Sequence, residues 1–166
     1  MVRHLYAAYG SNLHPLRLNA RIPTARFRYC TVLRGYALRF DKPGSDGSAK
    51  ANIVRRAQAR VNVAVYAMGR SMETLDGIEG SGYDRVPVVL ADGQTAWTYV
   101  ANRTKADLAP FGWYRDLIWA GARYHRFERS YCERIENIEV RRDRNETRAT
   151  RNAQMIAQAL AALSGR

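Results

Sequence analysis

The sequence predicts an α+β domain, a fold class in which helices and strands do not alternate regularly. Roughly six or seven segments have the composition of β-strands, and helical segments of different lengths lie between them. They do not follow the strand–helix–strand order that a parallel sheet requires. With 166 residues, of which 46% are hydrophobic, the chain is long enough to bury one core.

The strand segments are recognised by β-branched and aromatic residues that partly alternate with polar ones. Gly35 is expected to break one long run into two strands. Asp92 and Gly93 separate two other strands and are typical of a two-residue hairpin turn. In chain order the expected strands are His4–Tyr9, Arg26–Leu33, Tyr36–Asp41, Ala51–Arg55, Arg60–Met68, Tyr83–Ala91 and Gln94–Ala101.

Helices are expected where apolar residues recur every three or four positions. After the first strand, Leu13, Leu16 and Ala20 would share one face. Later in the chain, Gly112–Tyr124 is expected to be a helix, and Glu128–Val140 is a mixed segment.

A short helix is also expected to begin at Ser71 and to end at Gly80, because serine favours helix N-caps and glycine favours the position after a helix. Its expected buried stripe consists of Met72, Leu75 and Ile78.

Residues 141–166 are expected to form a basic linker and an added C-terminal helix, beyond a domain of residues 1–140. Asn145 can cap this helix. The apolar stripe at its end would pack either on the core or on a second subunit, so a homodimer remains open. This stripe consists of Met155, Ile156, Ala159, Leu160 and Leu163.

The formal net charge of +12 is typical of proteins that bind nucleic acids or anionic surfaces. The arginines are dispersed, however, and no zinc finger or aromatic RNA-reading pattern accompanies them. A nucleic-acid-associated protein is therefore the less favoured alternative. Its contacts would come from the one dense basic group, Arg141, Arg142, Arg144, Arg148 and Arg151.

The composition does not predict a membrane protein, a secreted protein or a metalloprotein. No run approaches the length of a membrane helix, about 18 apolar residues, and no N-terminal hydrophobic segment with a cleavage site is seen. The two cysteines and three histidines show no metal-ligand spacing. We therefore expect a cytoplasmic protein with no metal, no cofactor and no membrane partner.

The stretch Tyr6–Leu13 carries the first indication of a binding site. A strand rich in aromatic and small residues stops at Gly10, Ser11 and Asn12, which favour turns. Such a turn directs successive backbone N–H groups to one side, where they can bind a carboxylate or a carbonyl oxygen. Taken alone, the turn is more typical of an ordinary strand-to-helix connection than of a binding site.

A second stretch, Leu75-Asp-x-x-Glu79-Gly80 followed by Tyr83, lies well downstream. Together with Tyr9-Gly-Ser-Asn-Leu13 it resembles the gamma-glutamylcyclotransferase family. The resemblance extends in the same order over roughly residues 5–140. Its further parts are Gly35-Tyr-Ala-Leu-Arg-Phe40, Val63-Ala-Val-Tyr66, and Trp113-Tyr114 before Ile118-x-x-Gly121-Ala122.

This resemblance implies a small mixed β-barrel flanked by helices, with the first turn at its mouth. It also implies a reaction in which the α-amine of a γ-glutamyl amide attacks the substrate's own side-chain carbonyl. The products are 5-oxoproline and an amine or amino acid. Because the nucleophile belongs to the substrate, the enzyme supplies only a base, hydrogen-bond donors and positioning. Glutathione metabolism in a bacterial cell is the expected context.

Within the resemblance, Glu79 is the expected catalytic base, which would also return a proton to the leaving amine. It lies at the end of the predicted short helix, where the helix dipole disfavours a carboxylate, and an apolar pocket would raise the pKa of its carboxyl further. A solvated glutamate at a helix end is the ordinary alternative. Asp76, three residues earlier, is expected to be structural.

The substrate is expected to lie in the first turn, held by backbone N–H groups and closed in by aromatic walls. Glycine at the start of the turn permits close approach of the backbone. The expected substrate-binding residues are Tyr9, Gly10, Ser11, Asn12, Leu13, Tyr83 and Tyr114.

The pocket for the leaving amine is not recognisable in the sequence, and the loop of residues 42–50 is short and glycine-rich where some members of the family have longer ones. The Tyr-Gly-Ser-Asn-Leu form resembles the members that act on γ-glutamyl amino acids. The main alternative is a non-catalytic member of the same fold that binds a small ligand or a protein. Glu79 argues against it, because a scaffold without activity does not require that carboxylate.

Overall fold

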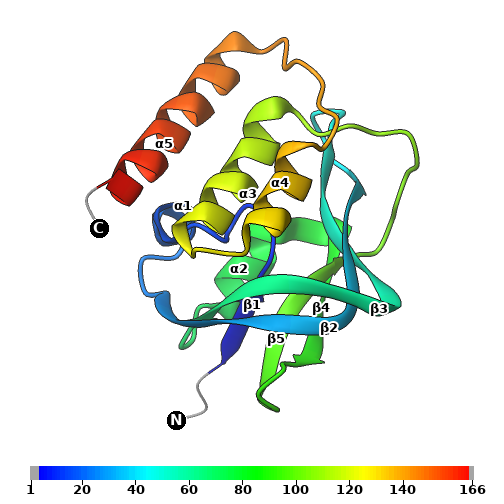
Figure 1. Cartoon of the computed structure of the whole chain (residues 1–166), viewed down its shortest axis with the longest axis vertical. Helices are drawn as coiled ribbons and strands as arrows, with labels where there is room; N and C mark the ends of the chain where they lie inside the picture. Colours follow the sequence, from blue (N-terminus) through cyan, green and yellow to red (C-terminus); the bar gives the residue numbers. More distant parts are fainter. Residues whose placement is uncertain (1–3, 165–166) are drawn as a thin grey trace.

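The computed structural model describes the main chain of residues 4–164 and the side chains as far as residue 162. A five-stranded sheet occupies one part of the molecule, and most of the helices gather beside it (Figure 1). The strands are β1 (Leu5–Ala8), β2 (Arg26–Pro43), β3 (Ala49–Ala67), β4 (Tyr83–Val89) and β5 (Thr95–Ala101). The helices are α1 (Pro15–Arg21), α2 (Met72–Glu79), the short 3-10 turn η1 (Gly80–Gly82), α3 (Gly112–Tyr124), α4 (Arg129–Glu136) and α5 (Glu146–Ser164).

The sheet has the strand order β2-β3-β1-β5-β4 and is mixed, since β1 pairs antiparallel with β3 and parallel with β5. Strand β1 is central and almost fully buried, with Ala7 and Ala8 at 0% exposure. The expected α+β fold with flanking helices is confirmed. The described strands form an open sheet, with β2 and β4 at its edges, and do not close into a complete barrel.

One long hairpin replaces the four strands that were expected between residues 26 and 68. Strands β2 and β3 pair antiparallel over their whole length, and their register shifts between Arg34 and Tyr36. Gly35 lies at this shift with φ +77°, a left-handed conformation that favours glycine. Gly35 therefore forms a β-bulge inside one strand and does not end it, which a breaker residue in the sequence could not reveal.

The first two helices lie where they were expected, but some of the residues expected to be buried are exposed. In α1 the buried residue is Leu18, while Leu16 is 46% exposed. In α2 Met72 and Leu75 are buried, and Ile78 is 40% exposed. The Ser71 hydroxyl makes no cap hydrogen bond in α2, because it lies 2.7 Å from the hydroxyl of Thr24.

The later helices follow the sequence prediction closely. Helix α3 has the predicted bounds, and Asn145 caps α5 by accepting a hydrogen bond from the backbone N–H of Arg148 at 2.9 Å. Helix α5 packs along α3 of the same chain, with Ala159 buried (Figure 1). The side chain of Leu163, part of the expected stripe, lies outside the described residues. None of the helices within residues 4–164 is both long and apolar enough to cross a membrane.

Candidate active site

A small pocket lies where the turn after β1 meets the end of α2 and the first residue of β4. It contains about 290 Å³ of empty space, part of it open to solvent. The lining residues are Tyr6, Tyr9, Gly10, Ser11, Asn12, Ala51, Glu79, Tyr83, Tyr99 and Tyr114.

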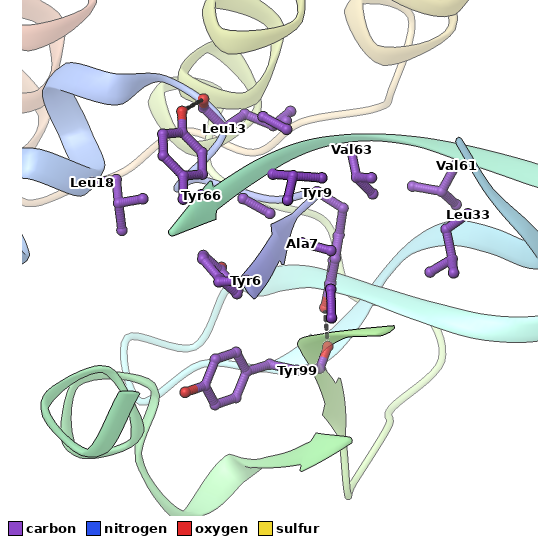
Figure 2. Packing of buried hydrophobic residues seen from close by; sticks show 14 of the residues in the cluster. Tyr6, Ala7, Tyr9, Leu13, Leu18, Leu33, Val61, Val63, Tyr66 and Tyr99 are labelled. Carbon is purple, nitrogen blue, oxygen red and sulfur yellow. Dashed lines mark hydrogen bonds between the residues drawn. The ribbon is translucent and has the colours of Figure 1, made fainter. Parts of the chain in front are cut away.

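The turn at the pocket is fixed from both sides. Inside it, the backbone N–H of Leu13 donates to the carbonyl of Gly10 at 3.0 Å. From outside, the Tyr66 hydroxyl donates to the Leu13 carbonyl at 2.7 Å (Figure 2). Nε2 of His125 lies 2.7 Å from the same oxygen. Helix α3 approaches so closely at Gly121 that a Cβ there would lie 2.6 Å from Cβ of Leu13. The turn therefore has a rigid support, which a preorganised binding site requires.

Glu79 is the one carboxylic acid among the residues that line the pocket, and it lies at the end of α2. Its Oε1 accepts a hydrogen bond from Nδ2 of Asn12 at 2.9 Å and lies 3.8 Å from Nη1 of Arg21. Its side chain is 17% exposed. Burial raises the pKa of the Glu79 carboxyl, and Arg21 and Asn12 oppose that shift. The Glu79 carboxyl therefore binds its proton more tightly than a solvated glutamate does.

The amide of Asn12 links this carboxylate to the rest of the pocket. Its Oδ1 accepts from Nη1 of Arg21 at 3.1 Å, and its Nδ2 also donates to the hydroxyl of Tyr6 at 3.2 Å. Asn12 itself is only 3% exposed. These contacts orient the amide of Asn12, whose Nδ2 is directed at the Glu79 carboxylate.

Aromatic side chains enclose the rest of the pocket. The Tyr9 hydroxyl donates to the main-chain carbonyl of Tyr99 at 2.7 Å (Figure 2), and the Tyr83 hydroxyl donates to the carbonyl of Ala51 at 2.6 Å. The Tyr114 hydroxyl accepts from the backbone N–H of Ala51 at 3.1 Å. These bonds join the strands to α3 around the cavity.

The structure brings together most of the residues that the sequence nominated. Seven of the eight expected site residues line the pocket, and the exception is Leu13. Its side chain is fully buried and its N–H closes the turn, so it supports the site from behind. Asp76, which was expected to be structural, accepts from the Tyr99 hydroxyl at 2.7 Å and pairs with Arg85 at 3.3 Å.

Sequence reasoning missed four residues of the site: Tyr6, Ala51, Tyr99 and Arg21. Tyr6 lies in the nominated stretch, but strand alternation places Tyr6 and Tyr9 on opposite faces. Both reach the pocket because β1 ends at Ala8 and the chain then turns. No local signal marks Ala51, Tyr99 or Arg21 in the sequence. Ala51 and Tyr99 approach the turn through the pairing of strands in the sheet, and Arg21 approaches it from the end of α1.

The basic group near the C-terminus is partly used within the chain. Arg148 binds the carboxylate of Asp143 through two nitrogens, and Nη1 of Arg141 donates to the carbonyl of Gly47 at 3.1 Å. Within residues 4–164 no group of His, Cys, Asp and Glu is arranged to hold a metal ion.

The comparison with protein families decides the family of the chain. The model of the family described as "Gamma-glutamyl cyclotransferase, AIG2-like" matches residues 6–116, which include the turn, Glu79, Tyr83 and Tyr114. The chain belongs to the AIG2-like gamma-glutamyl cyclotransferase family. None of the curated proteins matches the sequence.

Solved structures support this AIG2-like assignment at the level of the fold. A protein described as "Gamma-glutamyl cyclotransferase" superposes with a TM-score of 0.79 at 24% identity, over 95% of this chain and 99% of that one. An uncharacterized protein of Homo sapiens gives a TM-score of 0.80 at 24% identity, over 93% and 98% of the two chains. YkqA from Bacillus subtilis gives 0.68 at 19% identity, over 85% and 57%. The fold likeness therefore extends beyond the segment that the family model covers.

Proposed function

We propose that this protein is a γ-glutamylcyclotransferase that converts a γ-glutamyl amide into 5-oxoproline and a free amine or amino acid, with Glu79 as the base. The observation that carries the proposal is the position of Glu79. Its carboxylate is largely buried, and it faces the same small pocket as the Gly10–Asn12 turn. Membership of the AIG2-like family supports the same reaction class.

The substrate needs two kinds of contact, and the pocket offers both. Its α-carboxylate needs donors, which the backbone N–H groups of Gly10, Ser11 and Asn12 would supply, since these residues line the pocket. Its α-amine needs a proton acceptor nearby, which is the Glu79 carboxylate. In this proposal the glutamyl part of the substrate enters the pocket and the amine part stays near its opening.

Glu79 moves protons in two directions during the reaction. It accepts a proton from the substrate's ammonium group, so that the nitrogen can attack the carbonyl carbon. It then delivers that proton to the nitrogen that leaves. A carboxyl whose pKa is raised by burial is better suited to this exchange than a solvated one, because its proton affinity is closer to that of the groups it serves.

The test is the release of 5-oxoproline, measured by mass spectrometry from γ-glutamyl amino acids, γ-glutamyl amines and glutathione. The variant Glu79→Gln should lose about a thousandfold in turnover, since positioned acid–base groups contribute roughly 10²–10⁴-fold. Glu73→Gln is the matched control, because Glu73 is an exposed glutamate of the same helix. It should retain the full rate.

Turnover that persists in Glu79→Gln would remove Glu79 from its role as the base. If the wild type releases no 5-oxoproline from any substrate, the proposed reaction is wrong for these substrates. A melting-temperature shift with 5-oxoproline would then indicate a binding protein of the same fold.

A further inference from the structure

Tyrosine hydroxyls dominate the wall of the pocket, and three of them have their protons fixed. Tyr9 and Tyr83 donate to main-chain carbonyls, and Tyr99 donates to Oδ1 of Asp76 at 2.7 Å. A tyrosine hydroxyl carries one proton. These three hydroxyls therefore have no proton left for a ligand.

The other two hydroxyls, of Tyr6 and Tyr114, accept hydrogen bonds from protein N–H groups. Tyr6 accepts from Nδ2 of Asn12 at 3.2 Å, and Tyr114 accepts from the backbone N–H of Ala51 at 3.1 Å. Neither donor can change roles, because an amide nitrogen has only hydrogens to offer. Among residues 4–164 no hydrogen bond uses the proton of the Tyr6 hydroxyl. The Tyr114 hydroxyl has one further partner, the Ser11 side chain, whose own hydroxyl can be the donor and so leave the Tyr114 proton available.

The orientation of Asn12 follows from its neighbours. Oxygen and nitrogen of an asparagine amide are assigned from the hydrogen bonds they make. Arg21 can only donate, and its Nη1 lies 3.1 Å from one end of the amide, which must therefore be Oδ1. The other end is Nδ2, which lies 2.9 Å from the Glu79 carboxylate. Tyr6 thus meets an N–H group, and its own proton remains available.

We propose that Tyr6 and Tyr114 are catalytic residues that donate their hydroxyl protons, as hydrogen bonds, to the oxygen of the carbonyl under attack. This inference rests on the proposed cyclotransferase reaction and adds to it the source of oxyanion stabilisation. Both hydroxyls belong to residues that line the pocket beside Glu79. They come from β1 and α3, so they are held by rigid elements.

The bond changes balance without a further reactant. Glu79 takes a proton from the ammonium nitrogen, which then bonds to the carbonyl carbon, and the carbonyl electron pair moves onto the oxygen between the two hydroxyls. When the carbonyl forms again, the bond to the leaving nitrogen breaks. Two of the three ammonium protons end on the leaving amine, one of them by way of Glu79, and the third remains on the ring nitrogen.

The two tyrosines keep their own protons throughout. Burial raises the pKa of Tyr6 well above its ordinary value and that of Tyr114 to about 12, so both remain protonated at neutral pH. They act as donors to the developing charge and not as bases. Removal of one oxyanion donor typically lowers a rate by about 10²–10³-fold.

The experiment compares Tyr6→Phe, Tyr114→Phe and Tyr29→Phe in the 5-oxoproline assay. Tyr6→Phe should lower kcat about a hundredfold while KM changes less than threefold, since the donor acts on charge that is absent from the bound substrate. Tyr114→Phe should lower kcat similarly, with some loss of stability because it also bonds Ala51. Tyr29→Phe is the control with an unchanged rate, because the Tyr29 hydroxyl pairs with Gln94 away from the pocket. A Tyr6→Phe rate within threefold of the wild type, or a change in KM alone, overturns the proposal.

A binding measurement separates this inference from the proposed reaction. In 5-oxoproline the ring carbonyl oxygen descends from the attacked carbonyl, so calorimetry with 5-oxoproline probes the same contact without turnover. Loss of one such hydrogen bond should weaken binding about fivefold in Tyr6→Phe and leave Tyr29→Phe unchanged. If the wild type releases no 5-oxoproline, the cyclotransferase proposal fails, and the weakened binding alone then supports the donor pair. Equal binding of 5-oxoproline by wild type and Tyr6→Phe, or no binding by the wild type, overturns the proposal that the two tyrosines are donors.

Discussion

Two largely buried carboxylates, Asp143 and Glu79, show how neighbouring groups decide what a buried acid does. Asp143 lies between α3 and α5 with its side chain 2% exposed. It accepts from Nε1 of Trp113 at 2.8 Å, from Nε and Nη2 of Arg148 at 2.6 and 2.7 Å, and from the backbone N–H of Asn145 at 2.9 Å. The hydrogen bonds from Arg148 hold the pKa of Asp143 well below its usual range.

Glu79 has fewer and weaker partners. One neutral amide donates to it, and the nearest guanidinium stands 3.8 Å away and is turned toward Asn12. Burial therefore prevails and raises the pKa of Glu79. A fully satisfied carboxylate such as Asp143 is fixed as an anion and serves to join elements. A partly satisfied one such as Glu79 can exchange protons.

Replacing the structural carboxylate should produce the larger change in stability. Asp143→Asn should lower the free energy of unfolding by about 2 kcal/mol, because hydrogen bonds to charged groups contribute about 1.5–3 kcal/mol and the partly exposed Arg148 regains water. Asp116→Asn is the control, since Asp116 pairs with Arg115 and is 41% exposed. It should change stability by less than about 0.5 kcal/mol. Chemical denaturation measures both, and equal effects of the two variants would contradict the comparison.

Replacing Arg21 tests whether the pKa of Glu79 is a balance between burial and charge. Arg21 opposes the effect of burial, so Arg21→Gln should raise the pKa of Glu79 further. Carbon-13 NMR titration of the Glu79 carboxyl measures this without turnover, and the acid limb of the rate profile should move to higher pH with it. Arg129→Gln, which removes a 90% exposed arginine, should leave the titration unchanged. An unchanged titration in Arg21→Gln would show that Arg21 does not act on Glu79.

The smallest expected effect concerns the pH dependence of stability, which should have opposite signs for Glu79 and Asp143. The pKa of Glu79 is raised above 4.5 on folding, so the stability that its proton contributes is complete below pH 4.5 and is lost as pH rises through the folded pKa. Glu79→Gln should therefore raise the melting temperature at pH 7, by about 1–3 °C, and lose this advantage near pH 4.

Asp143 should behave in the opposite way. Its pKa is lowered on folding, so its contribution is present above the ordinary value of 3.8 and is lost only as pH falls through the lower folded value. Calorimetry at pH 7 and pH 4 checks the sign for Glu79→Gln, and calorimetry at pH 4 and about pH 2 checks it for Asp143→Asn. A lower melting temperature for Glu79→Gln at pH 7 would mean that the attraction of Arg21 outweighs burial.

Sequence reasoning succeeded where a local signal determines the structure. The bounds of α3, the Asp92-Gly93 hairpin, the end of α2 at Gly80 and the cap at Asn145 all follow from residue types and short spacings. The turn and Glu79 were found as a pair through the family resemblance, and the structure places them at one pocket. The sequence prediction was wrong at Gly35, because a glycine in a β-bulge and a glycine that ends a strand look the same in a sequence.

The sequence by itself determined the α+β class, the family and the position of the carboxylate at a helix end, because each depends on neighbours along the chain. Only the tertiary structure decided which groups surround that carboxylate. Arg21, at the end of α1, lies beside Asn12, and Tyr99 lies at the pocket because β5 pairs with β1. Tyr114, on α3, bonds to the backbone of Ala51. Burial and hydrogen-bond partners are properties of the folded chain. The different chemistry of Glu79 and Asp143 therefore follows from contacts between distant segments, which residue type and spacing do not specify.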